Sequence, residues 1–486
     1  MSNTQPARGM RDFLPADIRK REYVIGVIKE VYQKYGFEPL ETPSVENLET
    51  LMGKYGEEGN QLIFKILKRG EKLDVSAGEK GLSDLALRYD LTVPLARVVA
   101  NYKDKLPKFF KRYQIQPVWR ADRPARGRFR EFYQCDVDAI GSKSMIVEAE
   151  LISAVCEILW KLGFEDFAIK LNHRKLLTSM LEYADIPEDK HIDALVALDK
   201  LEKIGSEDVG KEFIERGIKE DSGNRLLNFL WTFFERRRVS IKEAKVAVQQ
   251  VWSENQDKTE TSKLKEIHEL NYGIIEKIEE SLGFSNSGRK AIVELRRILE
   301  NTKETFGCGK IIIDLTLARG LSYYTGAIFE IILTEGDFKG SIGGGGRYDG
   351  LIGMFGKEQI PACGFSLGLE RILVVMEERG MFDKLVEEGK LSIDSADVMI
   401  ACFDENLVGE SLKLAAELRE KNLRVLVYPE ASQKAKPMKY AEQIKVPFVC
   451  LLKQNEASEV QISLKNMQTS EQEISEREMI AERIKN

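Results

Sequence analysis

A strand pattern that stops and later resumes is the feature that most constrains how this chain folds. From 109 to 140 apolar residues recur with period two, which predicts two strands joined by a loop containing Pro and Gly. Residues 174 to about 303 are rich in Lys and Glu and place apolar residues at helical spacing. Strand patterns then return in "KIIIDLTLA" and "AIFEIIL". We therefore expect one sheet that is completed after a helical insertion, in a mixed α/β (α+β) fold.

Other segments are assigned by the same patterns. Helices are expected at 16–35, 144–162 and about 368–380, a strand through "FEPLETPSV", and a linker at 380–396. Beyond 396, three strand-like segments alternate with helical ones, which is typical of a small α/β domain. The expected division is therefore one domain in two parts, 1–173 and 304–385, with an insertion at 174–303 and a terminal domain at 396–486.

Composition excludes several classes of protein. No window approaches the roughly 18 apolar residues of a membrane span, and the N-terminus lacks a leader pattern, so we expect no membrane partner and a cytoplasmic protein. The six cysteines lie far apart without a CxxC pair, and the three histidines are scattered. A disulfide framework, a zinc site and a histidine-based catalytic triad are therefore not expected, and we expect no metal held by side chains.

Polar side chains follow one face of each strand in the region 109–140. Alternation predicts Arg112, Gln114, Gln116 and Arg120 on one face of the first strand, and Gln134, Asp136 and Asp138 on one face of the second. The opposite faces look like core. Such a face can simply point to water, but amide, guanidinium and carboxylate groups on neighbouring strands favour a binding site.

Other segments repeat this theme. In "LRYDLTVP" the residues Arg88, Asp90 and Thr92 would share a strand face that could accept a primary ammonium group. In "DLTLARGLSYYTG" an arginine, Arg319, leaves a strand just before Tyr323 and Tyr324, whose alternative role is packing. "GSIGGGGRYDG" fits neither a Walker A nor a dinucleotide loop, so its glycines are expected to allow close approach of a ligand or another strand.

Several arginines without a catalytic histidine or cysteine indicate anion stabilisation. Arginine is no base, but its planar fork binds phosphate oxygens in pairs. A substrate carboxylate that attacks the α-phosphate of ATP supplies its own nucleophile, and the enzyme needs only to position the groups and neutralise charge. That chemistry fits the residues available.

The segments "LRYDLTVP", "WRADRPARGRFREFYQCDVD", "LARGLSYYTG", "GGGGRYDGL" and "CGFSLGLERI", in this order, resemble the histidyl-tRNA synthetase family of class II aminoacyl-tRNA synthetases. The resemblance covers nearly the whole chain. It implies a class II antiparallel catalytic sheet, a homodimer formed through the region 16–45, a terminal anticodon-binding domain, and ATP (with Mg²⁺), L-histidine and tRNA(His) as substrates.

The resemblance also implies roles for individual residues. Arg120 would hold the α-phosphate and the substrate carboxylate, Arg319 would be the cationic catalyst, and Arg371 would bind the γ-phosphate, with Asp122 and Arg130 near ATP. The histidine pocket would contain Asp90, Leu91, Thr92, Arg120, Gln134, Asp138, Arg319, Tyr323, Tyr324 and Tyr348, of which Asp90, Thr92 and Gln134 bind the ammonium group and Asp138, Tyr324 and Tyr348 read the imidazole.

Two positions depart from the family pattern: Ser322 stands where Asp is common, and Met10 where Thr is common. A catalytically silent, histidine-binding regulatory relative is the competing hypothesis, and such relatives characteristically lack the anticodon-binding domain. Another class II synthetase is disfavoured by the two histidine-type signatures. In the terminal domain, Lys434, Lys436, Lys439 and Lys445 could contact tRNA phosphates or be ordinary solvated lysines.

Overall fold

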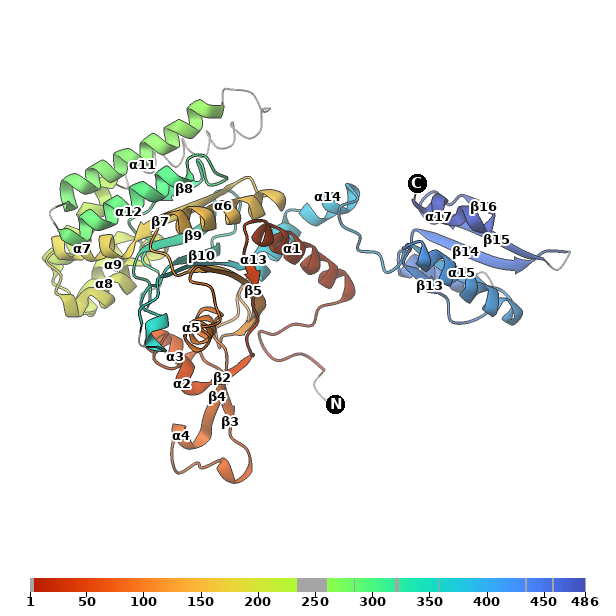
Figure 1. Ribbon diagram of the computed structural model, residues 1–486, viewed down its shortest axis with the longest axis horizontal. Helices are drawn as coiled ribbons and strands as arrows, with labels where there is room; N and C mark the ends of the chain where they lie inside the picture. The colour runs from red at the N-terminus through yellow and green to blue at the C-terminus, as the bar shows by residue number, and fades with distance from the viewer. Residues whose placement is uncertain are drawn as a thin grey trace. The chain divides into compact units, whose positions relative to one another are not determined.

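The computed structural model describes residues 4–233, 260–283, 285–319, 323–356, 358–432, 435–456 and 459–485. Contacts divide the chain into two compact units. One comprises the residues up to Asp12 and Arg21–Met381, and the other Phe13–Lys20 and the residues from Phe382 onward. Each unit contains its own sheet, and the expected mixed α/β fold class is confirmed (Figure 1).

The first unit is built on an eight-stranded sheet in the order β1-β5-β6-β11-β10-β9-β7-β8. All pairings from β5 to β7 are antiparallel, and only the two outer pairs, β1 with β5 and β7 with β8, are parallel. The strands are β1 Glu38–Pro39, β5 Phe110–Trp119, β6 Glu131–Ile140, β7 Phe167–His173, β8 Ile311–Ile313, β9 Ala327–Leu333, β10 Ser341–Arg347 and β11 Ala362–Gly368. Strands from before and after the helical block thus share one sheet, as the sequence pattern predicts.

A helical block separates the two sets of strands and lies beside α6 (Figure 1). Its described helices pack against one another and on β7, β8 and β9. They are α7 Arg174–Tyr183, α8 His191–Leu198, α9 Leu201–Glu215, α11 Glu260–Leu282 and α12 Asn286–Thr302. Residues 234–259 of the expected insertion lie outside the described part of the chain.

Other helices flank the sheet, and a small three-stranded sheet, β2-β4-β3, projects from the unit (Figure 1). Helix α6 is buried along almost its whole length because its sequence is apolar on most sides. The elements are α1 Pro15–Lys34, α2 Leu48–Leu51, α3 Gly56–Gln61, α4 Glu79–Leu82, α5 Thr92–Asn101, α6 Ile146–Lys161, α13 Leu369–Glu378, β2 Val45–Asn47, β3 Lys65–Leu67 and β4 Ser83–Leu87.

The second unit carries a five-stranded sheet in the order β13-β12-β14-β15-β16. Strand β12 pairs in parallel with β13 and β14, and the remaining pairings are antiparallel. Helix α14, Met381–Glu387, occupies part of the segment expected to be a linker. The other elements are α15 Val408–Glu420, α16 Ala435–Gln443, α17 Ile480–Lys485, β12 Val398–Cys402, β13 Val425–Val427, β14 Phe448–Gln454, β15 Val460–Asn466 and β16 Gln472–Ile474.

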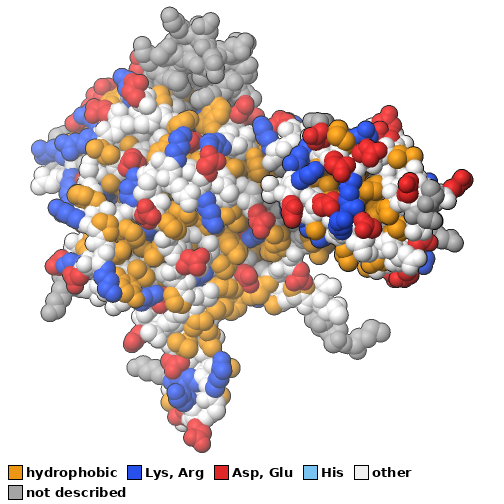
Figure 2. Space-filling model, turned by 45° about the vertical axis from the view of Figure 1, so that its right-hand side comes forward, with side chains coloured by type: hydrophobic (Ala, Val, Ile, Leu, Met, Phe, Trp, Pro, Cys, Tyr) orange, Lys and Arg blue, Asp and Glu red, His pale blue; other side chains and the backbone are white. Residues whose placement is uncertain are grey.

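Two further observations concern surface charge and the composition of the helices. On the face shown in Figure 2, Lys and Arg side chains are interspersed with Asp and Glu, so this face carries no large patch of one sign. Among the helices of the described residues, none combines the length and the apolar character needed to span a bilayer.

Two local expectations for the region 310–347 were wrong. The expected strand "KIIIDLTLA" is limited to Ile311–Ile313, and the glycine run, for which no element was predicted, forms strand β10. Glycine is required there because strands approach closely: a Cβ atom on Gly345 would lie 2.1 Å from the carbonyl oxygen of Gly364. The expectation that these glycines allow another strand to approach is confirmed, since β10 lies between β9 and β11.

A buried ion pair fixes the end of β10 to α6. The guanidinium of Arg347 donates from Nε to Glu148 Oε1 at 2.6 Å and from Nη2 to Oε2 at 2.8 Å, and both side chains are almost fully buried. Removing one partner of such a pair leaves a buried charge without compensation.

Glu148→Ala is therefore expected to lower the free energy of unfolding by about 3–5 kcal/mol. Thermal unfolding followed by circular dichroism measures the loss. Glu358→Ala is a matched control, because Glu358 pairs with Lys103 on the surface, and there a change of about 1 kcal/mol or less is expected. Equal shifts in the two variants would contradict a stabilising role for the buried pair.

Candidate functional site

Two adjoining cavities lie on the face of the large sheet formed by β6, β11, β10 and β9. The first has a volume of about 300 Å³ and the second about 240 Å³. Their linings have in common Arg120, Gln134, Arg319, Gly344 and Ser366. Together they have the size of a site for small molecules, and the shared residues mark the place where two ligands would meet.

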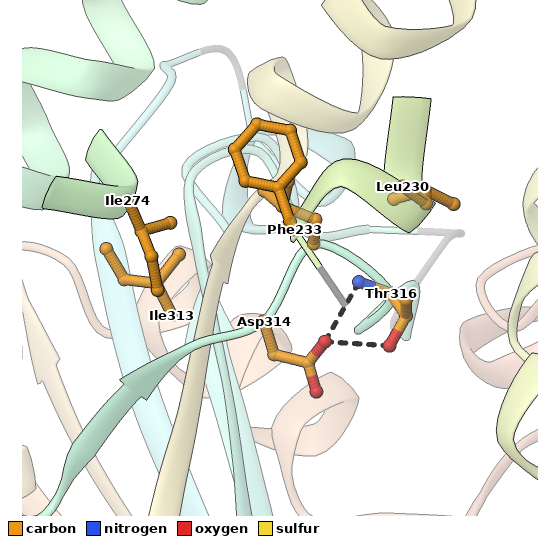
Figure 3. A pocket seen from close by; sticks show the side chains of 7 residues that line it. Leu230, Phe233, Ile274, Ile313, Asp314 and Thr316 are labelled. Atoms are coloured by element: carbon orange, nitrogen blue, oxygen red, sulfur yellow. Dashed lines mark hydrogen bonds between the residues drawn. The ribbon is translucent and has the colours of Figure 1, made fainter. Parts of the chain in front are cut away.

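A third cavity is too small to compete with them. It lies between the helical block and β8, and its volume of about 20 Å³ has room for little more than one water molecule. Figure 3 shows Leu230, Phe233, Ile274 and Ile313 around it, while Asp314 accepts hydrogen bonds from the backbone and hydroxyl of Thr316. We regard it as a packing gap.

The first cavity brings together nearly all residues that the resemblance implies for an amino-acid pocket. Leu91 is the exception: it is fully buried, and its carbonyl oxygen accepts a hydrogen bond from Arg112 Nη2 at 3.3 Å. The residues that line the cavity are Asp90, Thr92, Arg120, Gln134, Asp138, Arg319, Tyr323, Tyr324 and Tyr348, together with Asp136, Phe329, Gly345, Gly364, Phe365 and others named above.

The second cavity contains most of the residues that the resemblance implies for ATP. Arg120, Asp122, Arg319 and Arg371 line it, whereas Arg130 is not one of the lining residues. Arg130 Nε donates to the carbonyl oxygen of Asp122 at 3.2 Å. Arg130 is thus placed to hold the loop between β5 and β6, and Asp122 is placed to face the cavity.

Asp90 reaches the first cavity in a way that alternation did not predict. Strand β4 ends at Leu87 and Thr92 is the first residue of α5, so the expected strand face of Arg88, Asp90 and Thr92 is wrong. Asp90 Oδ1 instead accepts from the backbone of Val93 at 3.0 Å and from the Tyr55 hydroxyl at 2.9 Å. These two bonds fix the carboxylate, and its burial raises the pKa of Asp90.

Arg88 does not reach either cavity. Its guanidinium is fully buried and donates to the carbonyl oxygens of Pro117 at 2.8 Å and Thr42 at 2.6 Å. Arg88 thereby joins the loop before α5 to β5, the strand that contains Pro117. Its role is structural.

Arg120 is held at the junction of the two cavities by aromatic rings. Its Nε donates to the carbonyl oxygen of Tyr89 at 3.0 Å, and its guanidinium carbon lies 4.3 Å from the Tyr89 ring centroid and 5.2 Å from that of Phe132. Such stacking orients the planar fork and leaves its charge intact.

Arg319 and Arg371 approach each other across Ser341. Arg319 Nη1 lies 3.3 Å and Arg371 Nη1 3.2 Å from the Ser341 hydroxyl oxygen. Arg319 Nη1 also pairs with Glu330 at 2.8 Å, and its Nε lies 3.9 Å from Asp199 of the helical block. Glu330 and Asp199 therefore hold the arginine in this structure.

The second cavity concentrates positive charge. Burial, and the nearby guanidinium groups of Arg128, Arg319 and Arg120, lower the pKa of Arg371. A shift with these causes means that the charged form of Arg371 is disfavoured by its surroundings. A polyanion such as a triphosphate would relieve that repulsion.

The far end of the first cavity carries carboxylates. Asp138 on β6 pairs with Arg112 on β5 at 2.8 Å and accepts a short hydrogen bond from the Tyr348 hydroxyl. Glycine is needed at 364 on the neighbouring strand because a Cβ atom there would lie 1.9 Å from Asp138 Oδ1. Burial raises the pKa of Asp138, and the charge of Arg112 opposes that rise.

Asp136 provides a pH-dependent prediction. Burial raises the pKa of Asp136 to about 7, with Arg112 opposing and Asp138 adding to the rise. The pKa of an unfolded aspartate is about 4, so between about pH 4 and 7 the folded chain keeps a proton that the unfolded chain loses. The contribution of this group to stability is therefore full below pH 4 and is lost as the pH rises to 7.

Asp136→Asn is expected to stabilise the ligand-free protein at pH 8, by up to about 4 kcal/mol, and to have little effect near pH 4. Melting temperatures of the two proteins at both pH values measure the difference. Asp104→Asn, which alters an exposed carboxylate, should show no such dependence. A stabilisation that is equal at both pH values would contradict the assigned titration.

Several residues at the site were not assigned a role from the sequence. Asp136 and Arg112 were placed on the polar faces by alternation, but nothing in the sequence alone marked their pairing. The other residues come from segments far apart in the sequence, and no sequence pattern marked them as part of a site. They are Tyr55, Glu330, Ser341, Ser366 and Asp199. Gly320 and Ser322 beside Arg319, and Lys434, lie outside the described residues.

Comparisons with known proteins agree with this geometry. The family model described as histidyl-tRNA synthetase matches residues 9–372, and the model of an anticodon binding domain matches residues 397–486. The histidine–tRNA ligase of Christiangramia forsetii is 42% identical over 480 residues, covering 96% of this chain and 95% of that protein. The corresponding ligase of Flavobacterium johnsoniae is 40% identical over 499 residues, again covering 96% and 95%.

The fold is shared with a solved structure. The crystal structure of a histidyl-tRNA synthetase from Nostoc sp. PCC 7120 superimposes with a TM-score of 0.73 at 29% sequence identity. The match covers 100% of this chain and 99% of that one. The likeness therefore extends over both units.

Proposed function

The chain belongs to the histidyl-tRNA synthetase family, and from this premise we propose that its two cavities bind L-histidine and ATP and join them as histidyl-adenylate. The activated histidine is then transferred to tRNA(His). The observation that carries this assignment is the pair of adjoining cavities, one ending in carboxylates and the other lined by arginines, which share Arg120 and Arg319.

The first cavity takes histidine. Asp90, Thr92 and Gln134 accept hydrogen bonds from the α-ammonium group, beside Leu91 and Tyr323. Asp138, Tyr324 and Tyr348 contact the imidazole. An analogue without the ring nitrogens would leave these buried groups unpaired, a penalty that reaches roughly 10⁴- to 10⁵-fold in sites of this kind.

ATP enters the second cavity as its magnesium complex. Arg371, in the first turn of α13, binds the terminal phosphate, and Asp122 and Arg130 hold the loop that covers the nucleotide. The concentration of guanidinium groups around Arg371 supports this arrangement, because a polyphosphate neutralises it.

The reaction needs no base from the protein. The substrate carboxylate attacks the α-phosphorus, a bond forms between them, and the bond to the pyrophosphate oxygen breaks as pyrophosphate leaves. Arg120 aligns the carboxylate with the α-phosphate, since it lines both cavities. Arg319 stabilises the negative charge that accumulates on the phosphorus oxygens.

The chain as a whole supports the proposal. We assign the catalytic domain to 1–173 and 304–385, the helical insertion to 174–303 and the anticodon-binding domain to 396–486. Lys436 and Lys439 on α16, with Lys445 beyond it, are exposed and would face tRNA phosphates. A homodimer formed through α1 and the strands that follow it, working in the cytoplasm, completes the assignment.

Charging of tRNA tests the function against its competitor, a silent regulatory subunit. The match of 397–486 to an anticodon binding domain favours the ligase, because such regulators characteristically lack that domain. Purified protein with tRNA(His), ATP and labelled histidine should give acid-precipitable histidyl-tRNA, with tRNA of another specificity as the control. Folded protein that binds histidine but forms no charged tRNA would support the regulator.

A further inference from the structure

Two carboxylates lie side by side at the far end of the first cavity. Asp136 and Asp138 alternate with core residues on β6, so both point to the same face, and each is only 2% exposed. Both line the cavity. The guanidinium of Arg112 lies 2.8 Å from Asp138 Oδ2 and 4.0 Å from Asp136 Oδ2. With both aspartates ionised, one guanidinium therefore faces two negative charges.

Neither carboxylate has all its lone pairs satisfied. Asp138 Oδ1 accepts a hydrogen bond from the Tyr348 hydroxyl, whereas Asp138 Oδ2 lies 2.8 Å from Arg112 Nη2 but makes no hydrogen bond within the described residues. The contacts of Asp136 are longer: Gln134 Nε2 lies 3.4 Å from Oδ1 and Arg112 Nη2 lies 4.0 Å from Oδ2, and the Ser366 hydroxyl is its other partner. A carboxylate has about four lone-pair sites, so Asp136 can accept further bonds from a ligand.

Three further polar atoms around this end are buried and have no hydrogen bond within the described residues. Asp138 Oδ2 and Gln134 Oε1 are acceptors, of which Gln134 Oε1 faces the α-ammonium group in the proposed function, and Arg112 Nε is a donor. Buried polar groups without partners are costly unless a ligand satisfies them. The two carboxylates and the unpaired acceptors favour a ligand that donates hydrogen bonds and carries positive charge at this end.

Charged and titratable groups of both signs surround Asp136. Arg112 and the more distant Arg88 are positive, whereas Asp138 and Asp90 are negative, and the neutral groups are Tyr324, Tyr32 and Cys135. Arg88 is already bonded to backbone carbonyls. Asp90 faces the substrate ammonium in the proposed function, so the pair Asp136 and Asp138 is left with Arg112 alone.

We infer that Asp136 binds the histidine side chain directly, and that the pocket takes this side chain as a protonated imidazolium held by the Asp136 and Asp138 carboxylates. The protonated ring supplies the missing positive charge and two N–H donors, whereas the neutral ring has one donor and one acceptor. The inference deepens the proposed function and rests on it. It adds Asp136 as a residue that determines specificity for a basic ring.

The titration of the free site is consistent with this. Because burial raises the pKa of Asp136 to about 7, the empty pocket itself tends to take up a proton near neutral pH. At pH 8 the free carboxylate and the free imidazole are both mostly unprotonated. Formation of the imidazolium complex must then draw a proton from solution.

Calorimetry of histidine binding tests the inference without any variant. Binding is measured at pH 8 in buffers of different ionisation enthalpy, whose comparison gives the number of protons taken up. We expect uptake of close to one proton with histidine. Triazolylalanine, which has the same shape and α-ammonium group but a much less basic ring, should show none. Equal uptake with both ligands, or none with histidine, would overturn the inference.

The variant Asp136→Asn assigns the effect to this residue. We expect the Kd of histidine to rise roughly 10- to 100-fold, the value for the loss of one charge-assisted bond, while that of triazolylalanine changes less. Proton uptake should be lost and the KM for ATP retained. Asp314→Asn, which alters a buried aspartate that lines neither of the two ligand cavities, is the control. An unchanged preference for histidine would reject the role of Asp136, while histidine-dependent activity would leave the proposed function standing.

Discussion

Replacing Arg319 with alanine is expected to slow histidyl-adenylate formation by roughly 10²- to 10³-fold, the range seen when one preorganised donor is removed from a developing oxyanion. The KM for ATP should change far less. The reason is that Arg319 lies where the two cavities meet, so its charge acts on the α-phosphate mainly as negative charge accumulates there.

Single-turnover measurement of adenylate formation, with the KM for ATP measured in parallel, checks this prediction. Arg424→Ala is a suitable control, because Arg424 is a half-exposed arginine that pairs with Asp397 in the second unit. Equal losses in rate and in ATP binding would show that Arg319 is only a binding group. Glu330→Gln adds a second test, since it removes the carboxylate that holds Arg319 at 2.8 Å without removing the arginine.

Asp138→Ala is expected to raise the KM for histidine by roughly 10- to 100-fold without a comparable change for ATP. Two effects act in the same direction. The substitution removes an acceptor for the imidazole, and it leaves Arg112 fully buried without the carboxylate that lies 2.8 Å away. The KM values for histidine and ATP in the exchange reaction provide the measurement.

A loss of stability must be separated from a loss of recognition in this variant. Asp138→Asn keeps the shape of the side chain and removes only its charge, so it should show the same rise in the histidine KM with less unfolding. An unchanged histidine KM in both folded variants would reject the role of Asp138 in reading the ring.

The sequence was most informative where the chemistry is local. Periodicity identified α1, the two strands β5 and β6 and the return to the sheet after the helical block, because alternation of apolar residues directly reflects which face is covered. The same alternation placed Gln134, Asp136 and Asp138 on one face. From Gln134 onward both faces of β6 are in fact buried, since the polar face lines a cavity rather than meeting water.

Local patterns failed where tertiary contacts decide the conformation. Asp90 was expected on a strand, but the chain turns there into α5, and hydrogen bonds from Val93 and Tyr55 hold the carboxylate. The pairing of Arg319 with Glu330 and its approach to Asp199 join segments far apart in the chain. No spacing rule could reveal such contacts, because they depend on how the helical block meets the sheet.

Pyrophosphate exchange, measured with each amino acid in turn, is the most direct test of histidine activation by this protein. We expect rapid exchange of labelled pyrophosphate into ATP that depends on histidine, with the other amino acids giving no more than background. A separate measurement that the folded protein binds ATP excludes the possibility that exchange is absent only because the protein is unfolded. Absence of histidine-dependent exchange in such protein, or equal exchange with another amino acid, would contradict the assignment.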